Sequence, residues 1–219
     1  MKDRNAHLDT TLDSAVRDIL GRFERTSAVR DRSLNAGRHA IRHCANSIRE
    51  LHRGDLDGAR RQLASARLLL DSVRSETVEE PTVYWAGYVQ DAMKEFAEAS
   101  TLLAIISGEQ LPAPQAIEVE DAPFLNGLCE AASELRRLIL HTLQGDDLES
   151  AGRYLTAMND IYDLLITVDF PDAITGGLRR SVDQLRAVLE RTRGDFTLTH
   201  NQRRLETVIR GCQAEIEQR

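Results

Sequence analysis

Apolar residues recur every three or four positions along almost the whole chain, and no segment alternates apolar and polar residues over the length of a strand. The first pattern is typical of amphipathic helices, whereas sustained alternation would have indicated half-buried strands. Glycine and proline separate the periodic stretches from one another. The sequence therefore predicts an all-α protein, with helices at about 8–53, 57–74, 81–107, 123–145, 147–168 and 173–218.

The expected helix ends carry capping residues. "HRGD" ends the first helix, with Gly54 expected as its C-cap and Asp55 as the N-cap of the next helix. Pro81 opens the third helix, because proline is tolerated in a first turn. Weak points in the two longest predicted helices lie at 25–28 and at 193–197.

The composition excludes several classes of protein. The chain has 219 residues, 42% of them hydrophobic and 5% aromatic, which is ordinary for a globular helical protein. Its longest apolar run, 102–106, is far shorter than the roughly 18 residues that cross a bilayer. The N-terminus has no apolar segment of a secretory signal, so we expect a cytoplasmic protein without a membrane partner. Three widely spaced cysteines are expected to be small buried hydrophobes: Cys44, Cys129 and Cys212.

The net charge of −7 conceals an uneven distribution. Residues 1–75 carry 15 Lys and Arg against 10 Asp and Glu, whereas residues 76–219 carry 13 against 25. Of the 28 cationic residues 26 are arginine, whose planar guanidinium suits bidentate phosphate contacts. A GC-rich genome can also produce an excess of arginine. The arginine count alone therefore indicates a surface that can bind phosphates, and not a function.

Four arginines share one side of the first predicted helix. They lie at i, i+4, i+11 and i+15, within about 60° around the axis and over roughly 22 Å of its length. They are Arg38, Arg42, Arg49 and Arg53. Such a row can follow the phosphates of a nucleic acid strand. No aromatic residues are interleaved for base stacking, and a solvated face stays open as the alternative.

Carboxylates recur at i, i+4 and i+7 in "QDAMKEFAEAS", as Asp91, Glu95 and Glu98. Like charges at this spacing destabilise a helix, so either water screens them or a cation lies between them. One side of the fourth predicted helix carries a second polar set, which is Asn126, Glu130, Glu134, Arg137 and His141. If the two sides face each other, their glutamates form an oxygen-rich site of the kind that Mg²⁺ or Mn²⁺ prefers. These glutamates are Glu95, Glu98, Glu130 and Glu134.

Other catalytic signatures are absent from the sequence. It contains no pair of Glu-x-x-His motifs, which a di-iron bundle would need, and no HExxH, phosphate-binding GxxxxGK[ST] or GxSxG motif.

Three segments, in the same order, resemble the translin family, in particular its translin-associated factor X branch and the archaeal homologues. "RSLNAGRHAIRHCANSIRELHRGD" at 32–55 resembles the opening helix of that family, and "YVQDAMKEFAEA" at 88–99 resembles its third-helix motif. "FLNGLCEAASELRRL" at 124–138 resembles the segment that supplies a further acid. Glu130 stands there in place of the usual aspartate, which lengthens the reach by one methylene. The likeness runs from about residue 28 to 212.

The resemblance implies one translin-like domain over 1–219, in which 1–27 form the N-terminal part of the first helix. The family subunit has seven helices and assembles into a hollow octameric barrel. Family members bind single-stranded RNA and DNA, and the X subunits cleave single-stranded RNA with Mg²⁺ in RNA silencing and tRNA processing. The four arginines of the first helix would then lie, at least in part, along the path of the strand.

The acids of the X branch map onto named positions of this chain. The implied catalytic set is Glu95, Glu98, Glu130 and Glu134. Glu95, Glu98 and Glu130 would hold Mg²⁺, or Mn²⁺ in its place, and Glu98 or Glu134 would orient the attacking water. Asp91 has no role in this pattern, and we expect it to be solvated or close to RNA.

Two alternatives stay open at the level of sequence. The first is an oligomer that binds single-stranded nucleic acid without cleaving it, in which the acids are only structural. The second is a helical scaffold whose arginine and glutamate faces are solvated or paired across subunits.

Overall fold

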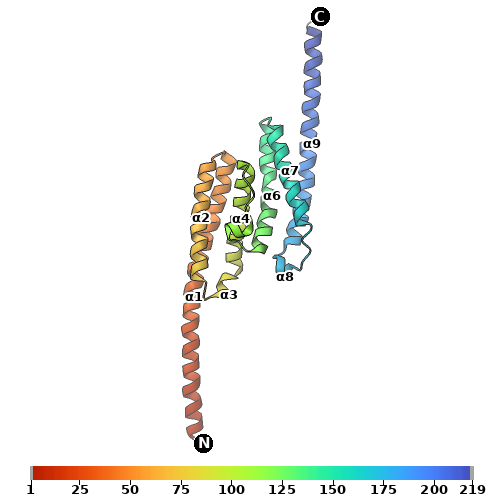
Figure 1. Cartoon of the computed structure of the whole chain (residues 1–219). Coiled ribbons are helices and arrows are strands. Elements are labelled where there is room, and N and C mark those ends of the chain that lie inside the picture. The colour runs from red at the N-terminus through yellow and green to blue at the C-terminus, as the bar shows by residue number, and fades with distance from the viewer. Residues whose placement is uncertain (1, 218–219) are drawn as a thin grey trace.

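The computed structural model describes the backbone of residues 2–217 and the side chains of 10–213 and 216. Over that range the chain contains helices and no strand, which confirms the all-α prediction (Figure 1). Six helices are long: α1 (Lys2–Arg53), α2 (Leu56–Glu76), α4 (Gly87–Ser107), α6 (Asp121–Gln144), α7 (Leu148–Leu165) and α9 (Leu178–Glu217). Three are single turns: α3 (Pro81–Tyr84), α5 (Pro114–Ile117) and α8 (Asp172–Thr175). The predicted end of the last helix, at 218, lies outside the described residues.

The predicted capping residues act as expected. The Asp55 carboxylate accepts a hydrogen bond of 2.8 Å from the backbone N–H of Gly58, and thereby satisfies a free donor in the first turn of α2. Gly54 has a φ of 79°, a left-handed conformation that glycine adopts without steric cost. Asp147 caps α7 in the same way, by accepting from the N–H of Ser150 at 2.9 Å.

The two predicted weak points are wrong, because α1 and α9 are continuous. At the first point, the Thr26 hydroxyl donates to Oε2 of Glu80 at 3.0 Å and ties α1 to the α2–α3 turn. At the second, Arg136 of α6 pairs with Asp195 of α9 at 2.8 Å. The third predicted helix is interrupted between α3 and α4, and the last one between α8 and α9. Tertiary contacts override local propensity at these places.

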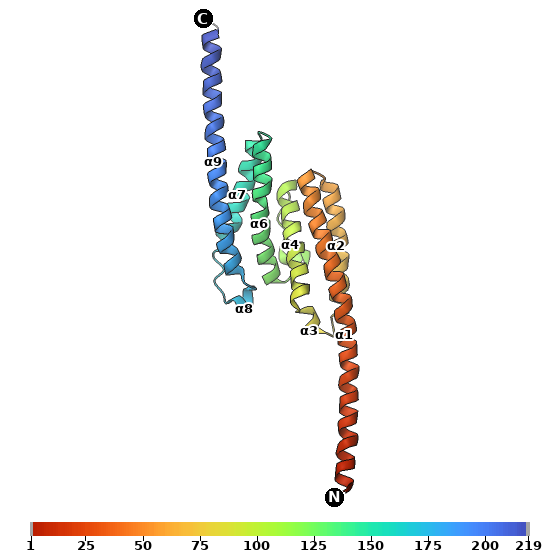
Figure 2. The ribbon, with the colours of Figure 1, turned by 180° about the vertical axis from the view of Figure 1, so that it is seen from behind.

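The helices form two layered groups that meet at α4 and α6 (Figures 1 and 2). One core cluster joins α1, α2 and α4, and the other is built mainly from α6, α7 and α9. Helix α1 packs closely on α4 because small residues line its buried stripe. A Cβ at Gly37 would lie 3.5 Å from the backbone oxygen of Tyr88. The contact between α4 and α6 therefore lies near the middle of the bundle, with α1 beside it.

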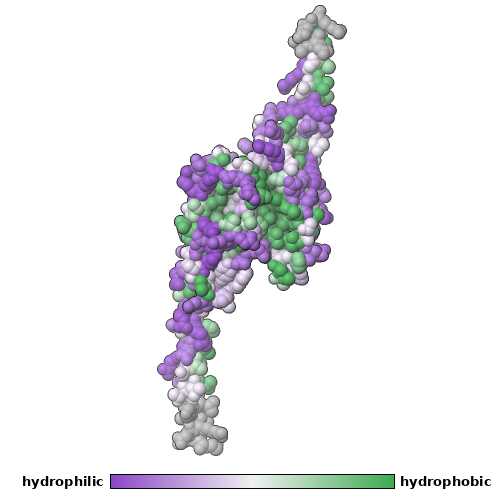
Figure 3. Space-filling view, viewed as in Figure 1, coloured by the Kyte–Doolittle hydropathy of each residue, from purple (hydrophilic) through white to green (hydrophobic). Residues whose placement is uncertain are grey.

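Both terminal helices project beyond the bundle, at opposite ends (Figures 1 and 2). The projecting part of α1 carries exposed apolar residues at i, i+4, i+7 and i+11, which are Leu12, Val16, Ile19 and Phe23. The projecting part of α9 carries a similar set, which is Leu198, Leu205, Ile209 and Ile216. Figure 3 shows apolar patches along both projecting ends. Neither of these stripes is covered within one subunit.

The cysteines are only partly as expected. Cys44 and Cys129 are buried, but Cys212 is exposed because it lies on the projecting part of α9. Among the described residues, no helix is both long enough and apolar enough to span a membrane.

Candidate functional site

Three of the four predicted carboxylates meet where α4 and α6 pack together. Glu95 and Glu98 come from α4 and Glu130 comes from α6, and one oxygen of each lies within 4.8 Å of the others. We call these three residues the acid trio. All three are partly buried, at the boundary between core and solvent. Asp91, one turn earlier on α4, is exposed and is not a member of this group.

Gly127 explains why the two helices approach so closely. A Cβ at this position would lie 2.7 Å from the backbone oxygen of Lys94 and 3.0 Å from the backbone nitrogen of Glu98. Only glycine fits such a contact with a neighbouring backbone. Gly127 lies one turn before Glu130 on α6, so the absence of a side chain at 127 brings Glu130 to Glu98.

Lys94 is the cation closest to the trio. Its Nζ lies 2.7 Å from Oε1 of Glu130 and 3.7 Å from Oε1 of Glu95. Burial opposes the charged form of Lys94, but the hydrogen bond and the neighbouring carboxylates outweigh burial and raise its pKa. The ammonium group therefore occupies a position where a positive charge is favoured by the acids of both helices.

One lysine does not neutralise three carboxylates, and the pKa values reflect this. The pKa of Glu98 is raised to about 8, mainly because the carboxyl is buried. The charges of Glu95, Glu130 and Glu134 contribute to the same shift. Burial and the charge of Glu130 also raise the pKa of Glu95. A cation bound among these oxygens would remove the repulsion, and an all-oxygen set is what hard divalent ions prefer.

Two buried thiols lie close enough to the trio for its charges to affect their pKa values. Burial, and then the charges of Glu95 and Glu98, raise the pKa of Cys44 on α1. Burial, and then the charge of Glu130, raise the pKa of Cys129 on α6 to about 12. Both thiols are therefore neutral at pH 7 and are not reactive groups of the site.

Glu134 lies one turn beyond Glu130 on α6 and has partners of its own. Its Oε1 lies 2.5 Å from Nε2 of His52 and 3.6 Å from Nη1 of Arg137. Because the pair with His52 joins α6 to the end of α1, it fixes the position of the carboxylate. Glu134 remains close enough to Glu98 to influence the pKa of that residue.

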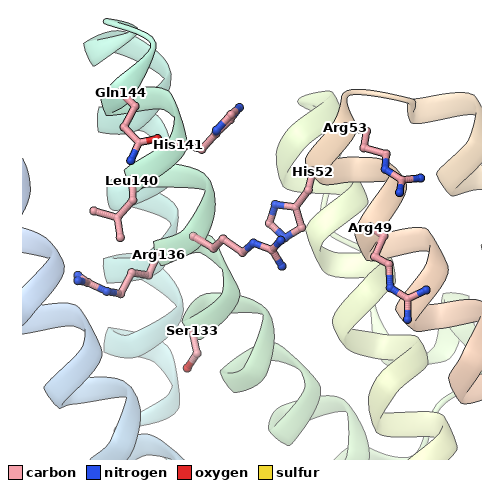
Figure 4. A pocket seen from close by; sticks show the side chains of 9 residues that line it. Arg49, His52, Arg53, Ser133, Arg136, Leu140, His141 and Gln144 are labelled. Carbon is pink, nitrogen blue, oxygen red and sulfur yellow. The ribbon is translucent and has the colours of Figure 1, made fainter.

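A basic cleft of about 730 Å³ opens beside Glu134, between the C-terminal ends of α1 and α6 (Figure 4). It is lined by Arg49, His52, Arg53, Ser133, Arg136, Arg137, Leu140, His141 and Gln144. His52 projects from α1 toward α6, whereas Arg136 points away from α1 toward α9 (Figure 4), where it pairs with Asp195 at 2.8 Å. A cleft whose charged lining is entirely cationic can bind an anionic polymer close to the acid trio.

The predicted arginine row divides between two places. Arg49 and Arg53 line the basic cleft, whereas Arg38 and Arg42 lie farther along α1 and do not. All four side chains are exposed. Arg49 donates to Asn46 at 2.5 Å, and Arg53 to Glu50 at 3.3 Å.

Three residues of the site were not singled out as functional from the sequence. These are Lys94, His52 and Arg136. Lys94 had a usable signal, because it is one of only two lysines and directly precedes Glu95. The sequence gives no such signal for His52 and Arg136, because their place in the site depends on how closely α1 and α6 approach each other.

Comparison with known proteins gives related sequences and related structures. No protein-family model matches the chain. An uncharacterized protein of Methanocaldococcus jannaschii is 30% identical over 172 residues, which cover 77% of this chain and 75% of that protein. A structure of AfC3PO in complex with duplex RNA matches with a TM-score of 0.80 and 34% identity, over 86% of this chain and 98% of that one.

Two further structures have the same fold. The crystal structure of AfC3PO matches with a TM-score of 0.79 at 34% identity and the same coverage. That of apo-NeC3PO matches with a TM-score of 0.67 at 19% identity, over 86% of this chain and 96% of that chain, and indicates similarity of fold alone.

Proposed function

The chain belongs to the C3PO/translin family, and on this premise we propose that it is an RNA-binding, divalent-metal-dependent endoribonuclease. One observation carries the proposal more than any other. Three carboxylate oxygens from two helices lie within 4.8 Å of one another, and Glu134, one turn further along α6, pairs with His52 in the wall of a cleft lined by arginines. Phosphodiester hydrolysis needs both the basic cleft and the acid trio, because the strand must be held and the charge of its scissile phosphate must be neutralised.

The acid trio fits a Mg²⁺ ion, or Mn²⁺ in its place. The donor set is all oxygen, and the charges of Glu95 and Glu130 add to the effect of burial in raising the pKa of Glu98. Glu95, Glu98 and Glu130 would hold the ion. A divalent ion bound there would lower the pKa of a water ligand and offset charge on the scissile phosphate.

The remaining residues supply orientation and binding. Glu134, held by His52, would orient the attacking water from the side of the basic cleft, and Glu98 is the other candidate for this role. Arg49, Arg53 and Arg137, which line the basic cleft, would position the phosphates of the strand.

RNA is favoured as the substrate because AfC3PO has been solved in complex with duplex RNA. We propose single-stranded RNA as the strand that is cut, with single-stranded DNA as a further ligand. The binding experiment therefore includes single-stranded and duplex RNA of the same length.

We also propose that the chain assembles with copies of itself, with eight subunits in the assembly. The exposed apolar stripes of α1 and α9 support assembly, since large apolar side chains in regular rows are usually covered in oligomers. A barrel of subunits would enclose the basic clefts and the acid trios around one strand.

The decisive experiment measures RNA binding and RNA cleavage separately, with metal removed by chelator and then added back. Wild-type protein is expected to bind labelled RNA under both conditions and to cut it only with Mg²⁺ or Mn²⁺. Glu95→Gln and Glu130→Gln should nearly abolish cleavage and keep binding, because each removes one negative charge and one ligand oxygen. Glu190→Gln, on the exposed side of α9, removes a charge elsewhere and serves as the control.

Each outcome identifies one function. Full cleavage by both trio variants would overturn the nuclease site. Binding without any metal-dependent cleavage would identify an oligomer that only binds RNA, and absence of binding would identify a scaffold.

A further inference from the structure

A second cleft, of about 570 Å³, lies on the opposite side of the acid trio from the basic cleft. It is formed by the N-terminal ends of α4 and α6 together with α8, at the end of the bundle where α3 and α8 lie (Figure 1). Glu130, a member of the trio, and Lys94, which pairs with it, both line this cleft. A ligand in this cleft would therefore be adjacent to the proposed catalytic centre.

Trp85 lies in the wall of this second cleft, and it is the only tryptophan in the chain. It is 59% exposed, although an indole of this size is usually well buried. Tyr84 holds it edge to face, with ring centroids 5.2 Å apart at 87°. The Tyr84 hydroxyl in turn donates to Oε1 of Glu120 at 2.6 Å. The exposed indole is thus supported by a fixed neighbour.

The charge of the second cleft excludes a phosphate. Its ionisable residues are Asp91, Lys94, Glu120, Asp121 and Glu130, that is, four acids and one cation. An uncharged planar group with N–H donors fits this lining much better, since carboxylates accept hydrogen bonds and an indole offers a stacking surface. The Gln90 amide nitrogen donates to the backbone oxygen of Tyr84 at 2.9 Å, so its carbonyl oxygen is the group left to accept a hydrogen bond.

A nucleobase has the chemistry that this lining requires. We propose that the second cleft binds one unpaired nucleobase of the RNA, stacked on Trp85, while the phosphates of the strand lie in the basic cleft. This inference rests on the proposed function, because it assumes that RNA reaches the acid trio. Along α6, Glu130 lies about 6 Å from Asn126 in the second cleft and about 10 Å from Arg137 in the basic cleft, at 1.5 Å rise per residue. A few nucleotides can therefore contact both clefts across the trio.

A cleft that binds one unpaired base would make the site select single-stranded RNA over duplex RNA. A base enters the cleft only if it has left its stack and its pairing partner, which costs free energy in a duplex and little in a single strand. Stacking on an aromatic side chain is tolerant of sequence, so we expect no strong preference among the four bases.

The test uses Trp85 as its own reporter, because no other tryptophan contributes to the emission. Full-length protein in chelator, which prevents cleavage, is titrated with single-stranded RNA while tryptophan fluorescence is recorded. Anisotropy of the same RNA, labelled, reports binding independently. We expect the emission of Trp85 to be quenched, with the same midpoint as the anisotropy. A strand with abasic positions throughout, and a blunt duplex of equal length, should bind without quenching.

Substitution completes the test. Trp85→Ala should weaken binding of single-stranded RNA by about tenfold, with less effect on the abasic strand, and Trp85→Phe should restore most of the affinity. Leu68→Ala, which truncates an exposed apolar side chain on α2, should leave affinity unchanged. Equal quenching by the abasic strand, or binding without any quenching, would overturn the nucleobase site and leave the proposed function standing. Absence of an anisotropy change would instead refute RNA binding itself.

Discussion

The ammonium nitrogen of Lys94 lies 2.7 Å from Oε1 of Glu130, so that one ion pair joins α4 to α6 inside the acid trio. A lysine in this position partly neutralises the acids and also competes with any other cation for the same oxygens. The pair therefore sets both the stability of the metal-free site and its affinity for a metal.

Replacing Lys94 should separate these two effects. In Lys94→Gln the trio loses its internal cation, so we expect Mn²⁺ to bind about tenfold more tightly, a change of only about 1.4 kcal/mol. Without metal the variant should unfold at a lower temperature than wild type, because the carboxylates of Glu95 and Glu130 then lose the cation that contacts both of them. Calorimetric titration with Mn²⁺ and thermal unfolding in chelator measure the two quantities. Weaker Mn²⁺ binding by the variant would show that Lys94 supports the ion rather than competing with it.

A side chain at position 127 should disrupt the site from within the fold. In Gly127→Ala the new Cβ would lie 2.7 Å from both the Lys94 backbone oxygen and the Ala97 Cβ, so α4 and α6 must move apart. We expect the free energy of unfolding to fall by about 1–3 kcal/mol, typical of overpacking, together with weaker Mn²⁺ binding. Urea unfolding measures the first quantity. Gly194→Ala is the matched control, since nothing lies near its Cβ and it should stabilise α9 by about 0.5–1 kcal/mol.

Stability without metal should depend on pH through Glu98. Its pKa is raised from 4.5 to about 8 in the folded protein, so between these values the folded state holds the proton more strongly than the unfolded state. The free energy of unfolding must then fall as the pH rises from about 5 to 8. Urea unfolding at several pH values in chelator should show this decline in wild type and a smaller one in Glu98→Gln. An identical decline in both proteins would assign the effect to another group.

The basic cleft should make RNA binding dependent on salt. Removing one contact between an arginine and a phosphate should flatten the slope of log affinity against log salt concentration by about 0.7 for a single strand. The double variant Arg49→Ala, Arg53→Ala removes two cations from the cleft wall and should bind more weakly, with a flatter slope. Arg153→Ala combined with Arg191→Ala removes two exposed arginines from α7 and α9 and should change neither quantity. Unchanged binding by the cleft variant would assign these arginines to contacts between subunits.

The apolar stripe on the projecting part of α1 should be needed for assembly. A charge in the middle of a buried apolar contact is costly, so Phe23→Asp should reduce the mass of the assembly. Ser14→Asp adds the same charge on the opposite side of α1 and is the control. Light scattering should give a mass near eight times the 24.6 kDa of one chain for wild type and for the control. A wild-type mass of one chain would refute the proposed oligomer.

Much of the fold could be predicted from the sequence because helical periodicity, capping aspartates and proline positions are local signals. The same periodicity placed Glu95 and Glu98 on one side of a helix, and Glu130 and Glu134 on one side of another. The metal role of these acids stays a prediction. The errors at 25–28 and 193–197 arose because propensity was weighed without the contacts of Thr26 and Asp195, which come from distant parts of the chain.

The sequence by itself thus determined which residues share a helix face, since that depends only on the 3.6-residue turn. The tertiary structure decided which faces meet. Gly127 allows α6 to approach α4 at Glu98, and α1 ends where His52 reaches Glu134. The physical reason is that a helix fixes the direction of each side chain around its own axis, whereas distances between helices are set by the volumes of the residues packed between them.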